Sequence, residues 1–316
     1  MNAGTAQAHA VPDDLIQPFQ IETFGVRGRL VRLGKLVDTI LGKHDYPEPV
    51  AAMLGELLAL AATLSGAIKF DGVFSVQTKG NGPIRFMVVD ITTTGEMRGY
   101  AQYDEAKVAA LPGRAGDSVP KLLGKGYLAF TVDQGPDTER YQGIVELNGA
   151  TLAECAHNYF RQSEQMDAAV KLAVGRVASN GGDAWRAAGM MVQRLPEAAP
   201  RRLLSGESAD EEVEEGWRRA VIMMGASTTG ELLDPRLHPH RLLYRLFHED
   251  GVRVYGPVEL SAGCRCSRAR VESTLRSFPR EEIGDMKIDG KVVVTCEFCS
   301  TDYVFDDADL DHLYRA

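Results

Sequence analysis

The order of hydrophobic and polar positions changes character along the chain. Between Phe19 and Leu152, short runs rich in β-branched and aromatic residues alternate with glycine-containing turns, and each run has the length of one strand. These runs are VRGRLVRL, GVFSVQTKG, IRFMVVDIT, MRGYAQY, GYLAFTVD and YQGIVEL. The pattern predicts that this part of the chain is built mainly from β-strands.

Two helices are predicted within the same region. The apolar stretch from about Pro49 to Ile68 contains Glu56 and several small residues, which suits a core helix better than a membrane span. A second helix is expected to open near Thr151, because apolar residues recur there at positions i, i+3, i+4 and i+7. This stripe consists of Leu152, Cys155, Ala156 and Tyr159. Strands and helices together predict a mixed α+β domain that ends near Pro196.

After Pro196 the chain becomes charged and amphipathic. Five acidic residues between positions 210 and 215 follow Ser208, and acids in a first turn predict that a helix begins there. One apolar face of this helix would consist of Trp217, Ala220, Val221 and Met224. A second amphipathic segment carries Leu242, Leu243, Leu246 and Phe247. We expect both helices to pack on the body of the protein, although stripes held by only a few turns could also come loose.

Composition and charge exclude several classes of protein. A chain of 316 residues is long for one domain, so two units, or one large unit with an appendage, are expected. A net charge of -9 repels the phosphates of nucleic acids and anionic membranes. The sequence has no patch of interleaved basic and aromatic residues that would bind them locally. We therefore expect neither nucleic acid nor a membrane as a partner. The first fifteen residues lack the charged and apolar regions of a signal peptide, which favours a cytoplasmic location.

Four of the five cysteines lie near the C-terminus. Cys264 and Cys266 form a Cys-x-Cys pair, and Cys296 and Cys299 form a Cys-x-x-Cys pair. Four thiolates are the ligand set of a tetrahedral structural zinc site, and a short spacing lets one turn offer two ligands to one metal. In a cytosolic protein such a cluster favours a metal over structural disulfides. We therefore predict one Zn²⁺ per chain, bound by all four cysteines.

The residues around the cysteines predict a small folded module. KVVVT and TDYVF read as two strands joined by the second cysteine pair, and Ser267 is placed to cap a helix between the pairs. The apolar stripe of that helix would be Val271, Leu275 and Phe278. A module of about 60 residues is too small to depend on its core alone, so a metal would hold it together.

The metal site has two interpretations. A purely structural site would suit a zinc-ribbon adaptor protein. A redox role is also possible chemically, because Arg265, Arg268 and Arg270 would favour thiolates, the form that oxidants attack. Loss of the thiolate ligands would then unfold the module, since the binding energy of such a site is folding energy.

Catalytic motifs are incomplete. Gly80-x-Gly82 lacks the rest of a dinucleotide-binding fingerprint, and GKGY at Gly124 lacks the remainder of a phosphate loop. GASTTG from Gly225 differs by one residue from a nucleophile elbow. We therefore predict that the protein is not an enzyme. Cys155 lies on the apolar stripe of its helix and is expected to be an inert core thiol.

The sequence resembles one known family over nearly its whole length. VYGPVELSAGCRCSRARVESTLRSFPREEI, followed by GKVVVTCEFCSTDYVFD, is similar to the zinc-binding end of the thirty-three-kilodalton heat-shock redox chaperonins. YFRQSEQ and AAGMMVQRLP are similar to the closing motifs of their N-terminal domain. The resemblance implies an ATP-independent holdase that is quiescent when reduced and zinc-bound. Oxidants such as peroxide, helped by unfolding conditions, would switch it on during oxidative stress.

Carried over by position, the resemblance also implies how the switch works. The four cysteines would be zinc ligands and then disulfide partners, Cys264 with Cys266 and Cys296 with Cys299. Loss of zinc would unfold the module and remove the docking partner of the linker. The face from Trp217 to Met224 could then hold unfolded client proteins, and dimerisation on activation is implied as well.

These expectations divide the chain into four parts. Residues 1–18 would be a disordered tail, 19–196 the α+β N-terminal domain, 197–253 the helical linker, and 254–316 the zinc-binding redox-switch domain.

Overall fold

The computed structural model of the chain describes residues 11–111, 118–135, 141–161, 167–179, 182–195 and 207–315. The first ten residues of the expected tail lie outside these ranges. In the described residues, two six-stranded sheets and a separate two-stranded hairpin alternate with helices. The predicted α+β class is therefore confirmed.

Sheet A has the strand order β10-β1-β2-β9-β8, and β11 also pairs with β1. Its strands are β1 (Leu15–Ile21), β2 (Val26–Leu33), β8 (Ala168–Ser179), β9 (Gly182–Arg194), β10 (Val252–Val254) and β11 (Val258–Glu259). Sheet B has the order β12-β5-β4-β3-β6-β7, and all its pairs are antiparallel except β12 with β5. Its strands are β3 (Val73–Gly80), β4 (Ile84–Thr92), β5 (Glu96–Tyr103), β6 (Gly126–Asp133), β7 (Tyr141–Glu146) and β12 (Ser261–Ala262).

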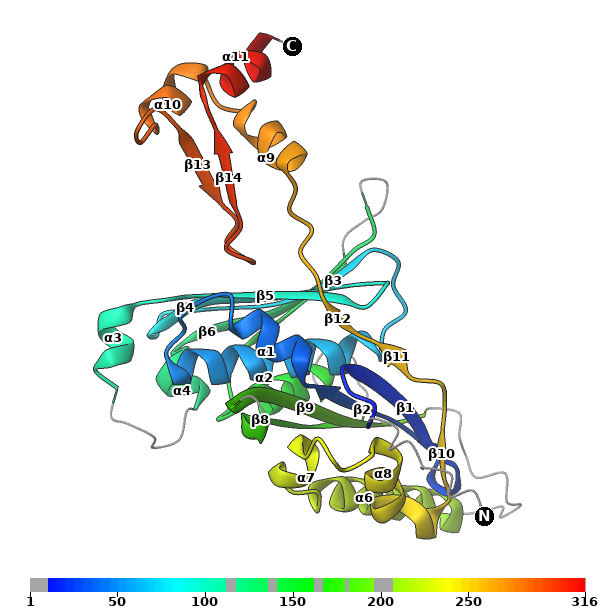
Figure 1. Cartoon of the computed structure of the whole chain (residues 1–316). Helices are drawn as coiled ribbons and strands as arrows, with labels where there is room; N and C mark the ends of the chain where they lie inside the picture. Colours follow the sequence, from blue (N-terminus) through cyan, green and yellow to red (C-terminus); the bar gives the residue numbers. More distant parts are fainter. Residues whose placement is uncertain are drawn as a thin grey trace, which may run out of the picture.

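The helices form layers with these sheets. Those of the body are α1 (Lys35–Leu41), α2 (Glu48–Ser65), α3 (Glu105–Ala109), α4 (Val119–Leu122) and α5 (Leu152–Tyr159), with the short 3-10 helix η1 (Glu22–Phe24). Those of the linker are α6 (Glu207–Gly225), α7 (Thr229–Leu233) and α8 (Pro239–Phe247), followed by η3 (His248–Asp250). Figure 1 shows α1 and α2 between the two sheets and α6 to α8 beneath sheet A.

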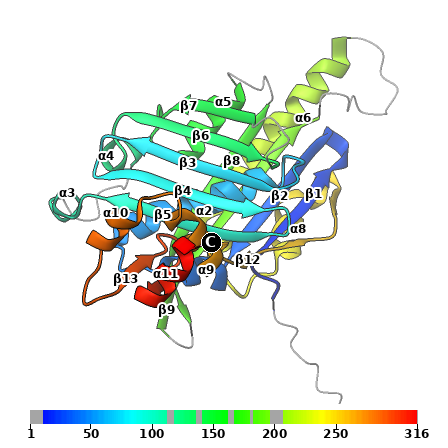
Figure 2. The same cartoon turned by 90° about the horizontal axis from the view of Figure 1, so that it is seen from above.

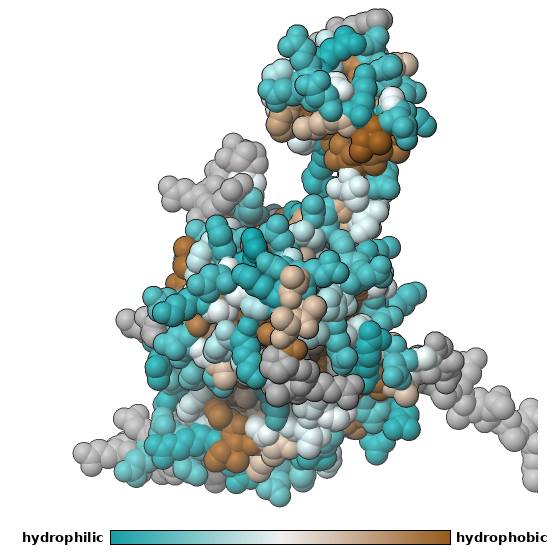
Figure 3. All heavy atoms as spheres, turned by 90° about the vertical axis from the view of Figure 1, so that its left-hand side faces the viewer, coloured by the Kyte–Doolittle hydropathy of each residue, from teal (hydrophilic) through white to brown (hydrophobic). Residues whose placement is uncertain are grey.

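The C-terminal module stands on the opposite side of the body, above sheet B. It contains α9 (Arg268–Leu275), α10 (Arg280–Asp285), β13 (Val292–Thr295), β14 (Asp302–Phe305) and α11 (Asp307–Arg315). Figure 2 shows the module lying over β4 and β5, and Figure 3 shows it as a projection joined to the body by a narrower neck. The module and the linker helices are thus separated by both sheets and α2.

The long predicted helix is the core of the body. Helix α2 is long and apolar enough to cross a membrane by length and composition, but 78% of its apolar window is buried inside the protein. It packs against strands of both sheets, and its buried side chains belong to the largest apolar cluster of the body. This confirms the interpretation of the stretch as a core helix.

Sheet A buries apolar side chains on both faces, because helices cover it on each side. On β2, Val31 and Leu33 belong to the cluster around α2, whereas Val26 and Leu30 belong to the cluster under α6 and α8. Side chains alternate between the two faces of a strand. Burial on both faces therefore explains why apolar residues occur at both even and odd positions of this strand, between its arginines.

Two expected domain boundaries are wrong. Residues 15–18 are not part of a disordered tail, since they begin β1, and Leu15 and Ile16 are buried. The C-terminal module does not begin at residue 254 either. Strands β10, β11 and β12 pair with β1 and β5 of the body, so the segment 252–262 is a strap along the body and the separate module begins after it.

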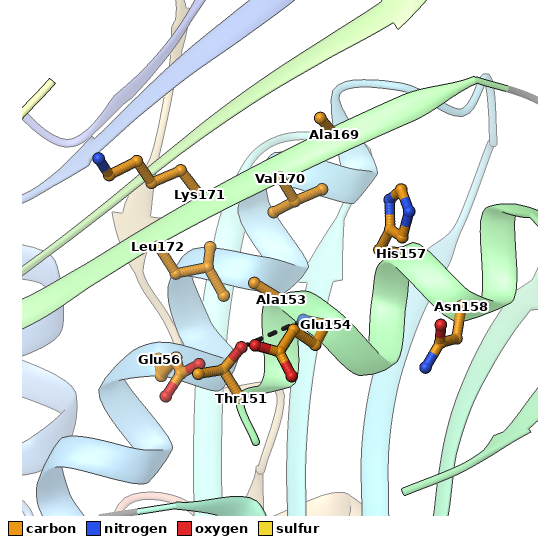
Figure 4. A pocket seen from close by; sticks show the side chains of 10 residues that line it. All are labelled: Glu56, Thr151, Ala153, Glu154, His157, Asn158, Ala169, Val170, Lys171 and Leu172. Carbon is orange, nitrogen blue, oxygen red and sulfur yellow. Dashed lines mark hydrogen bonds between the residues drawn. The ribbon is translucent and has the colours of Figure 1, made fainter. Parts of the chain in front are cut away.

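The carboxyl group of Glu56 makes the stability of the body depend on pH. It lines a pocket of about 460 Å³ between α2, α5 and β8 (Figure 4). Burial raises its pKa to about 7, although a hydrogen bond from the backbone N–H of Leu152 opposes this. Between its unfolded value of 4.5 and about 7, the folded state therefore keeps a proton that the unfolded chain has lost. Stability should fall as the pH rises through this window.

We expect Glu56→Gln to raise the free energy of unfolding by about 2 kcal/mol at pH 8 and by much less at pH 5. Glutamine keeps an acceptor oxygen for Leu152 and removes the charge. Urea unfolding followed by the fluorescence of buried Trp185 measures both values. Glu48→Gln, at the exposed start of the same helix, should leave the pH dependence in place. Equal stabilities of Glu56→Gln and the parent at both pH values would contradict the assignment.

Candidate metal centre

The two cysteine pairs lie on neighbouring turns. Cys264 and Cys266 follow β12 and precede α9, and Cys296 and Cys299 form the turn between β13 and β14. That turn is closed by backbone hydrogen bonds from Cys296 to Thr301 and from Ser300 to Cys296. The predicted strands and the predicted helix cap are confirmed, since β13 pairs with β14 and the Ser267 side chain accepts a hydrogen bond from the Arg270 backbone.

The module has only a small apolar core. Its buried side chains are Leu275, Ile283, Val292, Phe305, Leu310 and Leu313. Of the predicted stripe, Leu275 is buried and Val271 packs against this core, but Phe278 is 42% exposed because α9 ends at Leu275. A core of this size favours a module that needs a metal to stay folded.

The four sulfur atoms converge. All of them lie within 4.8 Å of one another, with 3.7 Å between those of Cys264 and Cys296 and 3.4 Å between those of Cys266 and Cys299. A tetrahedral zinc site with Zn–S bonds of about 2.3 Å places its sulfurs about 3.8 Å apart. Both the donor set and its spacing therefore suit one metal ion held by four thiolates.

Hydrogen bonds make the four thiols unequal. Burial opposes ionisation of Cys299, but its hydrogen bonds with the hydroxyl and backbone of Thr301 and with neighbouring thiols outweigh burial and lower its pKa to about 6. Burial and the neighbouring thiols raise the pKa of Cys266 to about 12, although the Tyr303 hydroxyl donates to its sulfur. These hydrogen bonds therefore favour the thiolate of Cys299 over that of Cys266.

The three arginines beside Cys264 and Cys266 bind other groups than the thiolates they were expected to stabilise. Arg265 binds Asp90 of β4, and Arg268 binds Glu272 and Asp309 and stacks on the Phe305 ring. Arg270 donates to the carbonyl of Arg265. Their guanidinium groups contact carboxylates, a carbonyl and an aromatic ring rather than the cysteine sulfurs. The prediction that these arginines keep the thiolates ionised is therefore not supported.

The predicted apolar face of α6 packs on sheet A. Ala220 and Met224 are buried, and Trp217 and Val221 are half-buried in the same cluster. Helix α6 begins at Glu207, close to the predicted start. The helix therefore hides this face in the structure, as expected for packing on the body.

Three cations of sheet A, which the sequence pattern does not predict, bind the ends of the linker helices. Lys171 donates to the carbonyls of Gly225 and Ser227, where α6 ends. Arg186 donates a hydrogen bond of 2.8 Å to the carbonyl of Leu233 at the end of α7. Arg32 donates hydrogen bonds to the carbonyls of Asp234 and Leu237, which follow α7. Cations suit the negative ends of helix dipoles. The only sequence feature that could have revealed them is the presence of charged residues inside apolar strands.

The described part of the linker, residues 207–253, does not dock on the cysteine module. Its helices cover sheet A, and the strap 252–262 connects them to the module across the edges of both sheets (Figure 1). The expectation that the module is the docking partner of the linker is therefore corrected. The described linker helices are held by the body itself.

Cys155 lies apart from the metal centre, in α5. It is fully buried, and burial together with nearby acidic groups raises its pKa to about 11. A buried thiol with a raised pKa reacts slowly with oxidants. This supports its interpretation as an inert core residue.

Comparisons with known proteins agree along the chain. Residues 14–306 match the family described as Hsp33 protein. The chain is 44% identical over 298 residues to the 33 kDa chaperonin of Caulobacter vibrioides, covering 94% of this chain and 96% of the relative. It is 36% identical over 304 residues to that of Ectopseudomonas mendocina, covering 96% and 95%. The crystal structure of the 33 kDa chaperonin from Thermotoga maritima superposes with a TM-score of 0.76 at 26% identity, covering 96% and 98% of the two chains. This chain therefore belongs to the Hsp33 family, as its motifs predict.

Proposed function

We propose that this protein is a redox-regulated holdase that binds unfolding proteins and prevents their aggregation under oxidative stress. The observation that carries the proposal is the cluster of four cysteines in a small module, within a chain of the Hsp33 family. A zinc-ribbon adaptor is not favoured, because the family match extends over the body and the linker as well as the module. Since the family consists of chaperones, we assign no catalytic residue.

In the reduced state, Cys264, Cys266, Cys296 and Cys299 would hold one Zn²⁺, which keeps the module folded. Oxidation joins Cys264 to Cys266 and Cys296 to Cys299. Each disulfide forms when two thiolates give two electrons to peroxide, whose O–O bond breaks and which leaves as water after taking up protons. Sulfurs in a disulfide no longer bind the ion, so the module loses its support.

The pairing decides what oxidation does to the module. The short S–S contacts of 3.7 and 3.4 Å run between the two turns, from Cys264 to Cys296 and from Cys266 to Cys299. Disulfides along these contacts would staple the turns together. Disulfides within each turn leave the turns free to separate, so the pairing of neighbours is the one that unfolds the module.

The client surface would be the apolar face of α6, with Trp217, Ala220, Val221 and Met224. This face is covered by sheet A in the packed state, so its release would expose an apolar patch that soluble proteins normally hide. The strap 252–262 is the covalent and hydrogen-bonded route from the module to the linker. We further place the protein in the cytoplasm, without nucleic acid or membrane partners, and expect it to dimerise when oxidised.

One experiment tests the function directly. Peroxide is added to the reduced protein at a mildly unfolding temperature, zinc release is followed with a chromogenic chelator, and light scattering of a denatured client is recorded in the same samples. We expect release of about one zinc per chain in step with suppressed aggregation. Zinc that is retained, or released without suppression of aggregation, would contradict the proposal.

A further inference from the structure

One ion pair of the body contacts both cysteine turns. Asp90 of β4 and Arg98 of β5 are cross-strand partners on sheet B, and the Arg98 guanidinium lies 2.7 Å from the Asp90 carboxylate. On β5, Met97 and Ala101 point to the opposite face from Arg98, and both are buried in the cluster around α2. The ion pair therefore lies on the outer face of sheet B, where the module stands.

The first turn is held through Asp90. Arg265, the residue between Cys264 and Cys266, places its guanidinium 2.5 Å from an oxygen of the same carboxylate. The other oxygen of Asp90 accepts a hydrogen bond of 2.6 Å from the Ser75 hydroxyl. Asp90 is only 6% exposed, and a buried carboxylate with all its partners in place is a rigid anchor.

The second turn is held through Arg98. Phe298, which lies between Cys296 and Cys299, has its ring 3.8 Å from the guanidinium carbon of Arg98. The Ser300 hydroxyl, directly after Cys299, donates a hydrogen bond of 2.9 Å to the carbonyl of Lys43, two residues after the end of α1. The body thus fixes the position of each turn through a side chain that is not itself a ligand.

We propose that Asp90 and Arg98 are positioning residues that hold the two cysteine turns together and thereby slow the loss of the metal and the oxidation of the thiolates. This inference rests on the proposed function, since it concerns the same four cysteines. The two turns lie more than 30 positions apart in sequence, and these body contacts add to the metal and to the module's own packing in keeping them adjacent. Ligands that are held in place rebind before the ion escapes, and they expose less sulfur to peroxide.

The test is the rate at which the reduced protein passes zinc to a chelator without any oxidant. Arg98→Ala and Phe298→Ala should each release zinc about fivefold faster than the parent, which is the effect expected from losing one cation–π contact. The double variant should be no faster than Arg98→Ala alone, because Arg98→Ala already removes the contact with Phe298. Zinc content should stay at about one ion per chain in every variant, since all four ligands remain.

Arg85→Ala is the matched control, because Arg85 lies on β4, the strand beside Arg98, and likewise binds an aspartate, Asp104, at 2.9 Å, but on an exposed site of the body. It should release zinc at the parent rate. The inference would be overturned if Arg98→Ala matched this control, or if the effects of Arg98→Ala and Phe298→Ala multiplied in the double variant. Phe298→Ala changes the module alone, so a general loss of body stability in Arg98→Ala would not hide the answer. A parent protein without bound zinc would overturn the proposed function itself.

Discussion

Replacing Cys296 and Cys299 with serine should abolish metal binding and unfold the C-terminal module while the body stays folded. The module has a core of six buried side chains, whereas a structural zinc site supplies on the order of 10 kcal/mol or more. Two hydroxyl groups do not replace two thiolates as zinc ligands. Zinc content should fall from about one ion per chain to near zero, and hydrogen exchange should show lost protection of β13, β14 and α9. Peroxide should no longer change the suppression of client aggregation.

The body provides both the internal control and a control variant. Amides of β3, β4 and β9 should keep their protection in the serine variant, because these strands pair within sheets that do not depend on the module. Cys155→Ser also removes a thiol, but from α5, and should bind zinc as the parent does. Tight zinc binding by the double serine variant, or a module that stays protected, would show that the metal does not hold the module together.

The parts of the fold that could be predicted depend on residues close together in sequence. The cap of α9 by Ser267, the β13–β14 hairpin and the cysteine spacing are all set within a few positions, so the sequence pattern alone predicts them. The buried stripe of α5 follows from the same kind of local periodicity. The core helix α2 and the spacing within each cysteine pair belong to this class.

The parts that could not be predicted depend on partners far away along the chain. The strap 252–262 reads as the start of the module, but its strands find β1 and β5 of the body, more than 150 positions earlier. Arg265 reads as a charge beside thiolates, yet its partner is Asp90, 175 positions away. Periodicity describes which face of an element is apolar, and it does not say which other element covers that face.

Arg32→Met should loosen the linker helices and lower the free energy of unfolding by about 3 kcal/mol, since Arg32 is a buried, paired cation. Its side chain is only 1% exposed and donates to the carbonyls of Asp234 and Leu237, between α7 and α8, beside Asp13. Methionine has a similar length but leaves those carbonyls without their donor. Amides of α7 and α8 should exchange faster, and the reduced protein should suppress client aggregation without oxidant if the linker face binds clients.

Arg29→Met separates this effect from general destabilisation. Arg29 lies on the same strand, is also buried at 8% exposure, and donates to the carbonyl of Gly66 at the end of α2, on the opposite face of sheet A. It should destabilise the body without selectively freeing α7 and α8. If exchange became faster in Arg32→Met alone, and only in the linker, the cations of sheet A would be what keeps the linker helices packed on the body. Equal exchange of the linker in both variants would instead mean that its release requires unfolding of the whole body, and the oxidised module would then have to act through the strap 252–262 on sheet A itself.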